Sequence, residues 1–196
     1  MKTGALILAA GASTRLGEPK QLLKFEGKTL LRRIAETALQ SNCSPVTVVL
    51  GANADDCRRE IADLPLEIVI ATNWAEGASA SLKSGLTGLL KSDPDLSAVV
   101  VLLCDQPFVT TATIARLVET FIKTQKPIVA CQYNEIIGVP TLFAREMFDN
   151  LFALEGDAGA RFLIKKQAAS GLAKIAAPEA AFDVDTVADY KLLLER

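Results

Sequence analysis

Histidine is absent from the 196 residues of this sequence. Its absence excludes Ser-His-Asp and Cys-His nucleophile chemistry, H-E-x-x-H zinc sites and a histidine general base. Any chemistry must therefore depend on carboxylates, lysine and arginine side chains, backbone N–H groups or a hard metal ion.

Cysteine is also sparse, with four residues spread along the chain and no C-x-x-C pair. This spacing is typical of buried thiols in a reducing compartment. No stretch reaches the roughly 20 apolar residues that a membrane span needs, and the run Ala5–Ala10 is too short for a signal peptide. A net charge of −2 and a pI near 5.3 give no general attraction to nucleic acid or anionic membranes. We therefore expect a cytoplasmic protein with neither nucleic acid nor membrane as a partner.

Apolar runs alternate with helical patterns along the chain. Buried strands are expected at Ala5–Ala10, Val46–Leu50, Leu66–Ala71, Ala98–Leu103 and Pro127–Cys131. Helices are expected at Thr29–Gln40, Asp55–Ala62, Ser79–Leu90, Thr111–Lys123, Arg145–Leu151, Ala158–Ala168 and Val187–Leu194. Asp55 and either Thr110 or Thr111 are predicted N-caps. This alternation predicts a single α/β domain over residues 1–196, with a mainly parallel sheet that Val139–Phe143 breaks.

In such a sheet, ligands bind at the carboxyl ends of the strands, so the residues after each strand carry the most information. Small residues follow the first strand from Ala10 to Ser13, and Arg15 and Lys20 add positive charge to the same loop. Small side chains and clustered backbone N–H groups suit phosphate oxygens. The loop lacks the glycine spacing of the Walker A and G-x-G-x-x-G motifs.

Carboxylates occur at two other places of this kind. Asp105 comes just after the run Ala98–Leu103, and Asp183 and Asp185 precede the last predicted helix. One carboxylate from each place would form a Mg²⁺ site completed by water and phosphate oxygens. The alternative is that Asp105 stabilises a turn and that Asp185 or Thr186 caps the last helix.

Together these motifs resemble the MobA-like NTP transferases and, within them, the molybdenum cofactor cytidylyltransferase (MocA-like) branch. The family's L-A-A-G-x-S-x-R-x-G-x-x-K signature is matched at Leu8, Ala9, Ala10, Gly11, Ser13, Arg15, Gly17 and Lys20. Family-like segments follow in order at Asn73–Gly77, Ser81–Leu82, Asp105–Pro107, Gly138–Pro140, Gly156–Arg161 and Asp183–Thr186. The resemblance implies a three-layer α/β/α sandwich with a mainly parallel mixed sheet, as in nucleotide-diphospho-sugar transferases.

The resemblance also implies the residues of the site. The nucleotide would be bound by Leu8, Ala9, Ala10, Gly11, Ala12, Ser13, Arg15, Lys20, Ser79, Ser81 and Leu82. The acceptor would be bound by Gly138, Pro140, Asp157 and Arg161. Mg²⁺ would be held by Asp105 and Asp185, and the catalytic residues would be Arg15, Lys20 and Asp105.

The implied reaction transfers CMP from CTP to the phosphate of molybdopterin or molybdenum cofactor, releases pyrophosphate and supplies the product to a molybdoenzyme. Ala10 and Gln106 favour CTP over GTP, because the guanylyl branch usually carries glycine and methionine there. A methyl group that crowds a purine discriminates by about 1–3 kcal/mol. Two alternatives stay open: a related transferase that uses GTP or another phosphorylated acceptor, and a non-catalytic molybdenum cofactor chaperone.

Overall fold

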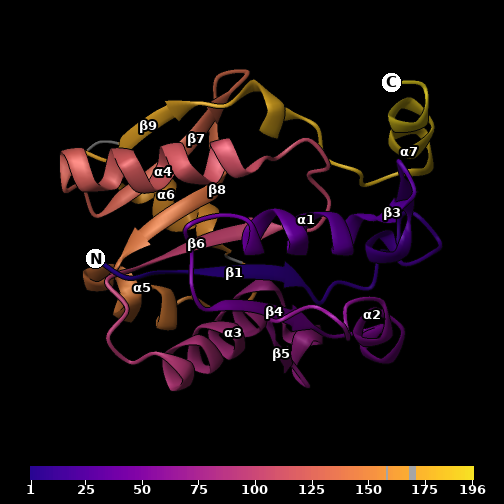
Figure 1. Cartoon of the computed structure of the whole chain (residues 1–196), viewed down its shortest axis with the longest axis horizontal. Helices are drawn as coiled ribbons and strands as arrows, with labels where there is room; N and C mark the ends of the chain where they lie inside the picture. Colours follow the sequence, from indigo (N-terminus) through magenta and orange to yellow (C-terminus); the bar gives the residue numbers. More distant parts are fainter. Residues whose placement is uncertain (158, 168–170) are drawn as a thin grey trace.

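The computed structural model of the protein describes residues 1–157, 159–167 and 171–196. A seven-stranded sheet forms its centre, in the order β5-β4-β1-β6-β8-β7-β9 (Figure 1). Its strands are β1 Thr3–Ala9, β4 Val46–Leu50, β5 Glu67–Ile70, β6 Ala98–Leu103, β7 Ile128–Tyr133, β8 Ile136–Ala144 and β9 Ala173–Ala176.

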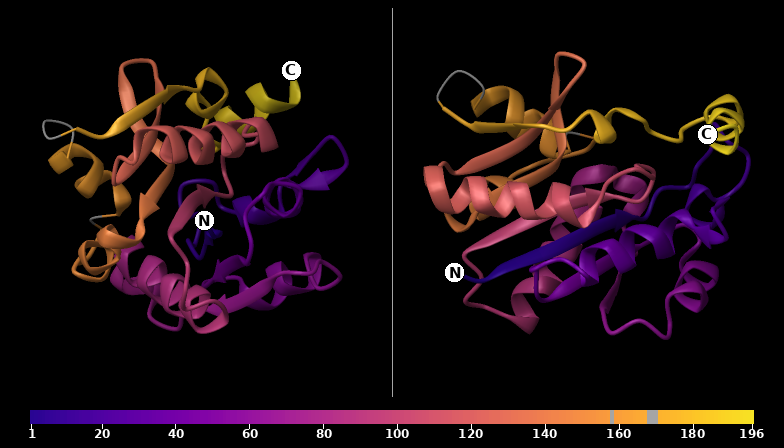
Figure 2. Two further views of the ribbon diagram at one scale, coloured as in Figure 1. Left: turned by 60° about the vertical axis from the view of Figure 1, so that its left-hand side comes forward. Right: turned by 45° about the horizontal axis from the view of Figure 1, so that its top comes forward.

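Helices cover both faces of this sheet (Figures 1 and 2). They are α1 Leu30–Leu39, α2 Ala54–Glu60, α3 Ala78–Ser92, α4 Thr111–Thr124, α5 Phe148–Phe152, α6 Ala160–Gln167 and α7 Val187–Leu194. Alternate residues of β1 face opposite layers, because Ala5 and Ile7 pack with α1, α2 and α4, whereas Leu6 packs with α3, α5 and α6. The three-layer α/β/α sandwich expected from the sequence is confirmed.

Strand β8 runs against the other strands of the sheet. It pairs antiparallel with β6 and β7, whereas β1 pairs parallel with β4 and β6, β4 with β5, and β7 with β9. The predicted extra strand at Val139–Phe143 is therefore confirmed and lies within β8.

The helix N-caps confirm one of the predicted caps and contradict another. Thr110 caps α4 and Thr186 caps α7 through their side-chain oxygens. The cap predicted at Asp55 is wrong: α2 begins at Ala54 after Asn53, and Asp55 lies in the first helical turn. There its charge still interacts favourably with the helix dipole.

Some elements differ from the predicted ones. The sequence analysis missed β9 and the two-stranded hairpin of β2 (Lys24–Phe25) and β3 (Lys28–Thr29). The ends of one predicted helix, Ala158 and Ala168, lie outside the described residues.

A small apolar core at one end of the sheet joins the loop after β1 to the C-terminal segment. It is made of Leu16, Leu23, Phe25, Leu30, Val184 and Leu193. Figure 2 shows α7 beside the β2–β3 hairpin, at the end of the molecule toward which β1 points in Figure 1. This packing brings the segment around Val184 next to the loop after β1.

The structure also bears on the expectations about cysteine and membranes. All four cysteines are free and buried, and burial raises the pKa of the Cys57 thiol to about 11. Among the described residues, none of the helices has both the length and the apolar content that a membrane crossing requires.

Candidate functional site

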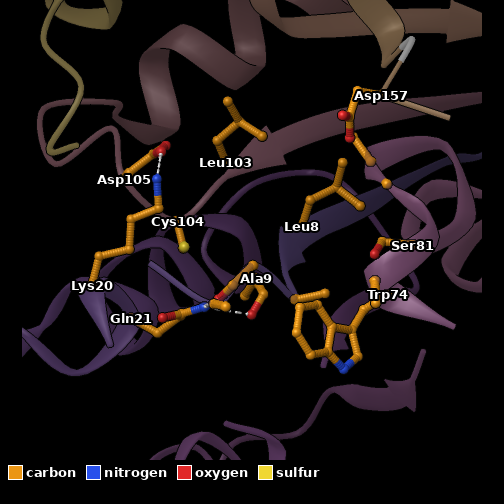
Figure 3. Close-up of a pocket in the computed structure, with 16 residues that line it drawn as sticks. Leu8, Ala9, Lys20, Gln21, Trp74, Ser81, Leu103, Cys104, Asp105 and Asp157 are labelled. Atoms are coloured by element: carbon orange, nitrogen blue, oxygen red, sulfur yellow. Dashed lines mark hydrogen bonds and ion pairs between the residues drawn. The ribbon is translucent and has the colours of Figure 1, made fainter. Parts of the chain in front are cut away.

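A cavity of about 450 Å³ opens at the carboxyl ends of β1 and β6 (Figure 3). Its lining combines the loop after β1, the start of α3 and the end of β6. The lining residues are Leu8, Ala9, Ala10, Gly11, Ala12, Lys20, Gln21, Trp74, Ala75, Gly77, Ala78, Ser81, Leu103, Cys104, Asp105 and Asp157. The cavity therefore lies where ligands bind in α/β sheets.

Four charged side chains form a cluster, of which Lys20 and Asp105 line this cavity and Arg15 and Asp185 line a smaller hollow beside Lys20. The Lys20 ammonium donates to Asp105 Oδ2 at 2.5 Å and to Asp185 Oδ1 at 2.9 Å. Arg15 contacts the other oxygen of Asp185 at 3.0 Å. A second, smaller hollow of about 150 Å³ adjoins this cluster and is lined by the loop residues Gly11 and Ser13 as well as by Lys20. The predicted catalytic and metal residues are thus brought together.

The cluster perturbs the protonation of its members. Burial alone would lower the pKa of Lys20, but the charge and hydrogen bonds of Asp105 and Asp185 outweigh it and raise that pKa above the usual value. Burial likewise opposes ionisation of Asp185, yet Lys20 and Arg15 lower the pKa of its carboxyl group. Both residues are therefore charged at neutral pH.

Nearby, one carboxylate oxygen is buried without a partner, because Asp105 Oδ1 accepts no hydrogen bond. Burial and the charge of Asp105 raise the pKa of the Asp183 carboxyl group, against the opposite effect of a hydrogen bond with Gln106. An unpaired buried acceptor is costly, so Asp105 Oδ1 is well placed to receive a cation or a hydrogen-bond donor.

The loop after β1 is held by a buried glutamine that the sequence analysis missed. Gln21 donates to the carbonyl oxygens of Ala9 and Gly11 at 2.9 and 2.8 Å. The Ser13 hydroxyl donates to Gln21 and accepts from the backbone N–H of Lys20. Ser13 has a φ of 56°, a left-handed conformation that is uncommon outside glycine. The side-chain bonds fix this conformation and so position Lys20.

The start of α3 meets only part of the prediction for base and ribose contacts. Ser81 lines the cavity. Ser79 and Leu82 are buried and do not line this cavity. Leu82 belongs to the apolar core between α3 and the sheet, because residues one apart on a helix face different directions. The side chain of Leu82 therefore packs in the core, and its place beside the nucleotide stays a prediction.

The predicted acceptor residues are divided between two places. Asp157 lines the main cavity, whereas Arg161 lines a separate cavity of about 430 Å³ beside Ile136 and Ile137. Gly138 and Pro140 lie within β8, with Gly138 packed so closely to Tyr133 that a Cβ there would stand 2.9 Å from its hydroxyl. The structure thus brings only Asp157 to the charged cavity.

Two further lining residues carried a signal that the sequence analysis did not use. Trp74 stands in a family-like segment and is the only tryptophan of the chain. Gln21 directly follows Lys20, the lysine of the loop signature. The role of Gln21 depends on how its own loop folds back on Ala9 and Gly11. The role of Trp74 depends on its contact with Gly51 after β4, so neither could be assigned from the sequence.

Comparison with known proteins indicates the same family as the sequence motifs do. The profile of the MobA-like NTP transferase domain matches residues 5–171. Nicotine blue oxidoreductase from Paenarthrobacter nicotinovorans is 34% identical over 97% of this chain and 96% of its own length.

Solved structures agree with the profile. The crystal structure of Rv0371c from Mycobacterium tuberculosis H37Rv has a TM-score of 0.84 and 32% identity, and covers 100% of this chain and 98% of that one. A structure of Rv0371c in complex with manganese has a TM-score of 0.81 and 29% identity, with coverage of 100% and 99%. By the extent of the profile match and of these likenesses, the chain belongs to the MobA-like NTP transferase family.

Proposed function

We propose that this protein transfers CMP from CTP to the terminal phosphate of a molybdopterin-type acceptor and releases pyrophosphate. The observation that carries the proposal is the cluster of Lys20, Asp105 and Asp185 beside the small-residue loop at the cavity. Both substrates are anionic, so such a reaction chiefly requires charge neutralisation and alignment. The paired cations and carboxylates at the rim of the cavity supply charge neutralisation and alignment.

A divalent metal ion fits this rim. Asp105 keeps one buried oxygen without a partner, and Asp185 reaches the same Lys20 ammonium. Within the described ranges, no three His, Cys, Asp or Glu side chains gather into a metal site. Mg²⁺, however, is commonly held by one or two carboxylates together with substrate phosphates. Asp105 and Asp185 would hold the ion, which would add positive charge beside the α- and β-phosphates. The manganese complex of Rv0371c supports a divalent ion for a protein of this family.

The chain's own residues then have distinct tasks in the transfer. An oxygen of the acceptor phosphate forms a bond to the α-phosphorus, and the bond from that phosphorus to the β-phosphate oxygen breaks. The leaving pyrophosphate keeps the electron pair, and Lys20 and Arg15 would hold its charge. A phosphate nucleophile is already largely ionised at neutral pH, so the absence of histidine is no obstacle.

Selectivity for CTP is supported by Ala10. This residue is 5% exposed and lines the cavity, and its methyl group lies next to Gly51. Compared with glycine, this methyl group narrows the cavity, which disfavours a purine more than a pyrimidine. Gln106 plays no such part, because it is buried and its amide donates to the carbonyl oxygens of Val139 and Ala180.

The proposal extends to the cellular context. The product would be a dinucleotide form of the molybdenum cofactor that a molybdoenzyme receives, and the protein would act in the cytoplasm. The acceptor would approach from the side of Asp157, which lines the cavity at the end opposite Lys20 (Figure 3).

A second function is favoured by one observation, the identity of 34% over nearly the whole chain to a protein named nicotine blue oxidoreductase. In that case the cavity would hold an electron carrier and an oxidised aromatic substrate. A third possibility, a chaperone that holds molybdenum cofactor without transfer, would leave the charged cluster without a chemical role.

Pyrophosphate release distinguishes these functions. The purified protein is incubated with Mg²⁺ and each of the four NTPs, with and without molybdopterin, and Asp105→Asn serves as the matched control. We expect release only when the acceptor is present, at a rate with CTP roughly tenfold above that with GTP. Faster release with GTP would overturn the choice of nucleotide alone. Absence of release with every NTP, together with NADH oxidation in the presence of nicotine blue, would replace the transferase with an oxidoreductase.

A further inference from the structure

The main cavity is lined by charged side chains at one end and by an aromatic side chain at another. Lys20 and Asp105 stand at the first end, and Trp74 stands away from them on the side of Ser81 (Figure 3). Among the described residues that line the cavity, Trp74 is the only aromatic one. A ligand that places phosphates at the charged end would therefore direct its other end toward the indole.

The indole is held firmly from one side. Trp74 packs against the apolar core between α3 and the sheet, and its backbone N–H donates to the carbonyl oxygen of Ala71 at 3.2 Å. A Cβ at Gly51 would stand only 2.8 Å from the Cγ atom of Trp74. Glycine at this position thus permits the close approach of the ring, which cannot shift toward the strand ends. One side of the ring is supported by protein, while Trp74 still contributes to the cavity wall.

A supported aromatic ring at the wall of a cavity suits a flat aromatic partner. Any nucleotide base can stack on tryptophan, because each base has a π-face. The neighbouring Leu8 and Leu103, which are partly buried against the same core, extend this apolar wall.

We propose that Trp74 is the stacking platform for the base of the nucleotide and thereby a binding residue that favours nucleotides over a bare triphosphate. This inference rests on the proposed nucleotidyl transfer and names a contact that neither the loop signature nor the charged cluster implies. Ala10 acts at the same place, since its methyl group and the indole both lie against Gly51. The base is thus bounded by the ring on one side and by the methyl-bearing loop on another.

The protein provides its own probe, because Trp74 is its only tryptophan. Indole fluorescence is titrated with CTP, GTP and inorganic tripolyphosphate, each with Mg²⁺ and without acceptor, so that no transfer occurs. We expect quenching by the nucleotides only. Tripolyphosphate should compete with CTP for the site and leave the fluorescence unchanged, because it lacks a base.

Variants test the contact by calorimetry, which needs no tryptophan. Trp74→Phe retains a ring and should bind CTP within a few-fold of the unmodified protein. Trp74→Leu retains apolar volume without a π-face and should bind CTP roughly ten- to a hundredfold more weakly, with tripolyphosphate affinity unchanged. Melting temperatures of both variants show that the comparison is between folded proteins.

The outcomes separate this inference from the proposed function. Equal quenching by tripolyphosphate and CTP, or equal CTP affinity of the leucine and phenylalanine variants, would remove Trp74 as a platform even if pyrophosphate release proceeds normally. Failure of any NTP to bind or react would instead overturn the proposed function. Quenching by CTP with selective loss in the leucine variant supports the stacking contact.

Discussion

Replacing Lys20 by methionine tests whether this lysine is the counter-ion that holds the two carboxylates together before substrates bind. Lys20 Nζ lies 2.5 Å from Asp105 and 2.9 Å from Asp185, and its side chain is 19% exposed. Methionine keeps most of the apolar stem and removes the charge. The variant should lose stability without metal, bind Mg²⁺ more tightly and bind CTP more weakly.

The size of the stability loss follows from burial. Removing one partner of a buried ion pair costs about 3–5 kcal/mol, whereas exposed pairs contribute about 0–1 kcal/mol. Asp105 is 12% exposed but Asp185 is 35% exposed, so only the first contact is close to the buried limit. We expect a loss of about 2–3 kcal/mol in the free energy of unfolding. For a chain of this size the melting temperature should fall by about 4–12 °C.

Although Lys20→Met should lower stability, it should raise the affinity for Mg²⁺. An ammonium group about 4 Å from a divalent ion repels it by roughly 2 kcal/mol even in water-like surroundings. Removing that charge should tighten Mg²⁺ binding at least about tenfold in the absence of nucleotide. Added Mg²⁺ should then restore part of the lost stability, because a ligand that binds the folded state stabilises it.

The stability difference between the unmodified protein and Lys20→Met should depend on pH. The pKa of Lys20 is raised, so its contribution is present below the usual lysine pKa and lost only at strongly alkaline pH. The pKa of Asp185 is lowered, so its contribution is present above the usual aspartate pKa and lost as the pH falls through the native value. The stability difference between the two proteins should therefore persist at neutral pH and shrink in acid.

Thermal unfolding in EDTA and in Mg²⁺, with calorimetric titration of Mg²⁺, measures these quantities. Lys28→Met is the matched control, because Lys28 pairs with Glu36 at the surface and its side chain is 52% exposed. This control should lose less than about 1 kcal/mol and keep the same Mg²⁺ affinity. A Lys20→Met protein that melts like the unmodified one in EDTA and binds Mg²⁺ no more tightly would refute the counter-ion role.

Three further predictions concern other parts of the site and the core. Asp105→Asn should lower the rate of pyrophosphate release on the order of 10²–10³-fold, and a rate within a few-fold of normal would remove Asp105 from the reaction. Gly51→Ala should destabilise the protein by about 1–3 kcal/mol in urea unfolding, because its Cβ would stand 2.5 Å from the carbonyl oxygen of Ala10. Gly11→Ala meets no atom within 4 Å and should unfold normally, so equal losses would contradict the packing argument. The four buried thiols should react with a disulfide reagent only after denaturation, and fast labelling of Cys57 in the native protein would contradict its raised pKa.

The sheet and the layers could be predicted because their signal is local. Buried parallel strands read as continuous apolar runs, so Val46–Leu50 and Ala98–Leu103 coincide with β4 and β6. The β2–β3 hairpin could not be found in this way, since each of its strands has only two residues. Its turn depends on left-handed conformations at Glu26 and Gly27, and only the second is signalled by residue type.

The site was predictable as a set of residues but only partly as a geometry. The meeting of Lys20 and Asp105, which are 85 positions apart, follows from adjacent parallel strands whose carboxyl ends share an edge. The arrival of Asp185 required the small apolar core around Val184, which no periodicity indicates. Leu82 illustrates the converse, because a family-like position on a helix still faces the direction that the helix gives it.

Charge balance explains why this cluster suits a transfer between two phosphates. Arg15 and Lys20 carry as much positive charge as Asp105 and Asp185 carry negative charge, so the site without substrates is neutral. A metal ion arriving alone would meet carboxylates that are already paired, whereas a metal–nucleotide complex brings phosphates able to take over the freed cations. The exchange keeps every charge paired, which matters most for Lys20 and Asp105, the two least exposed members of the cluster. Metal and nucleotide are thus expected to bind together, with Lys20 passing from the carboxylates to the triphosphate.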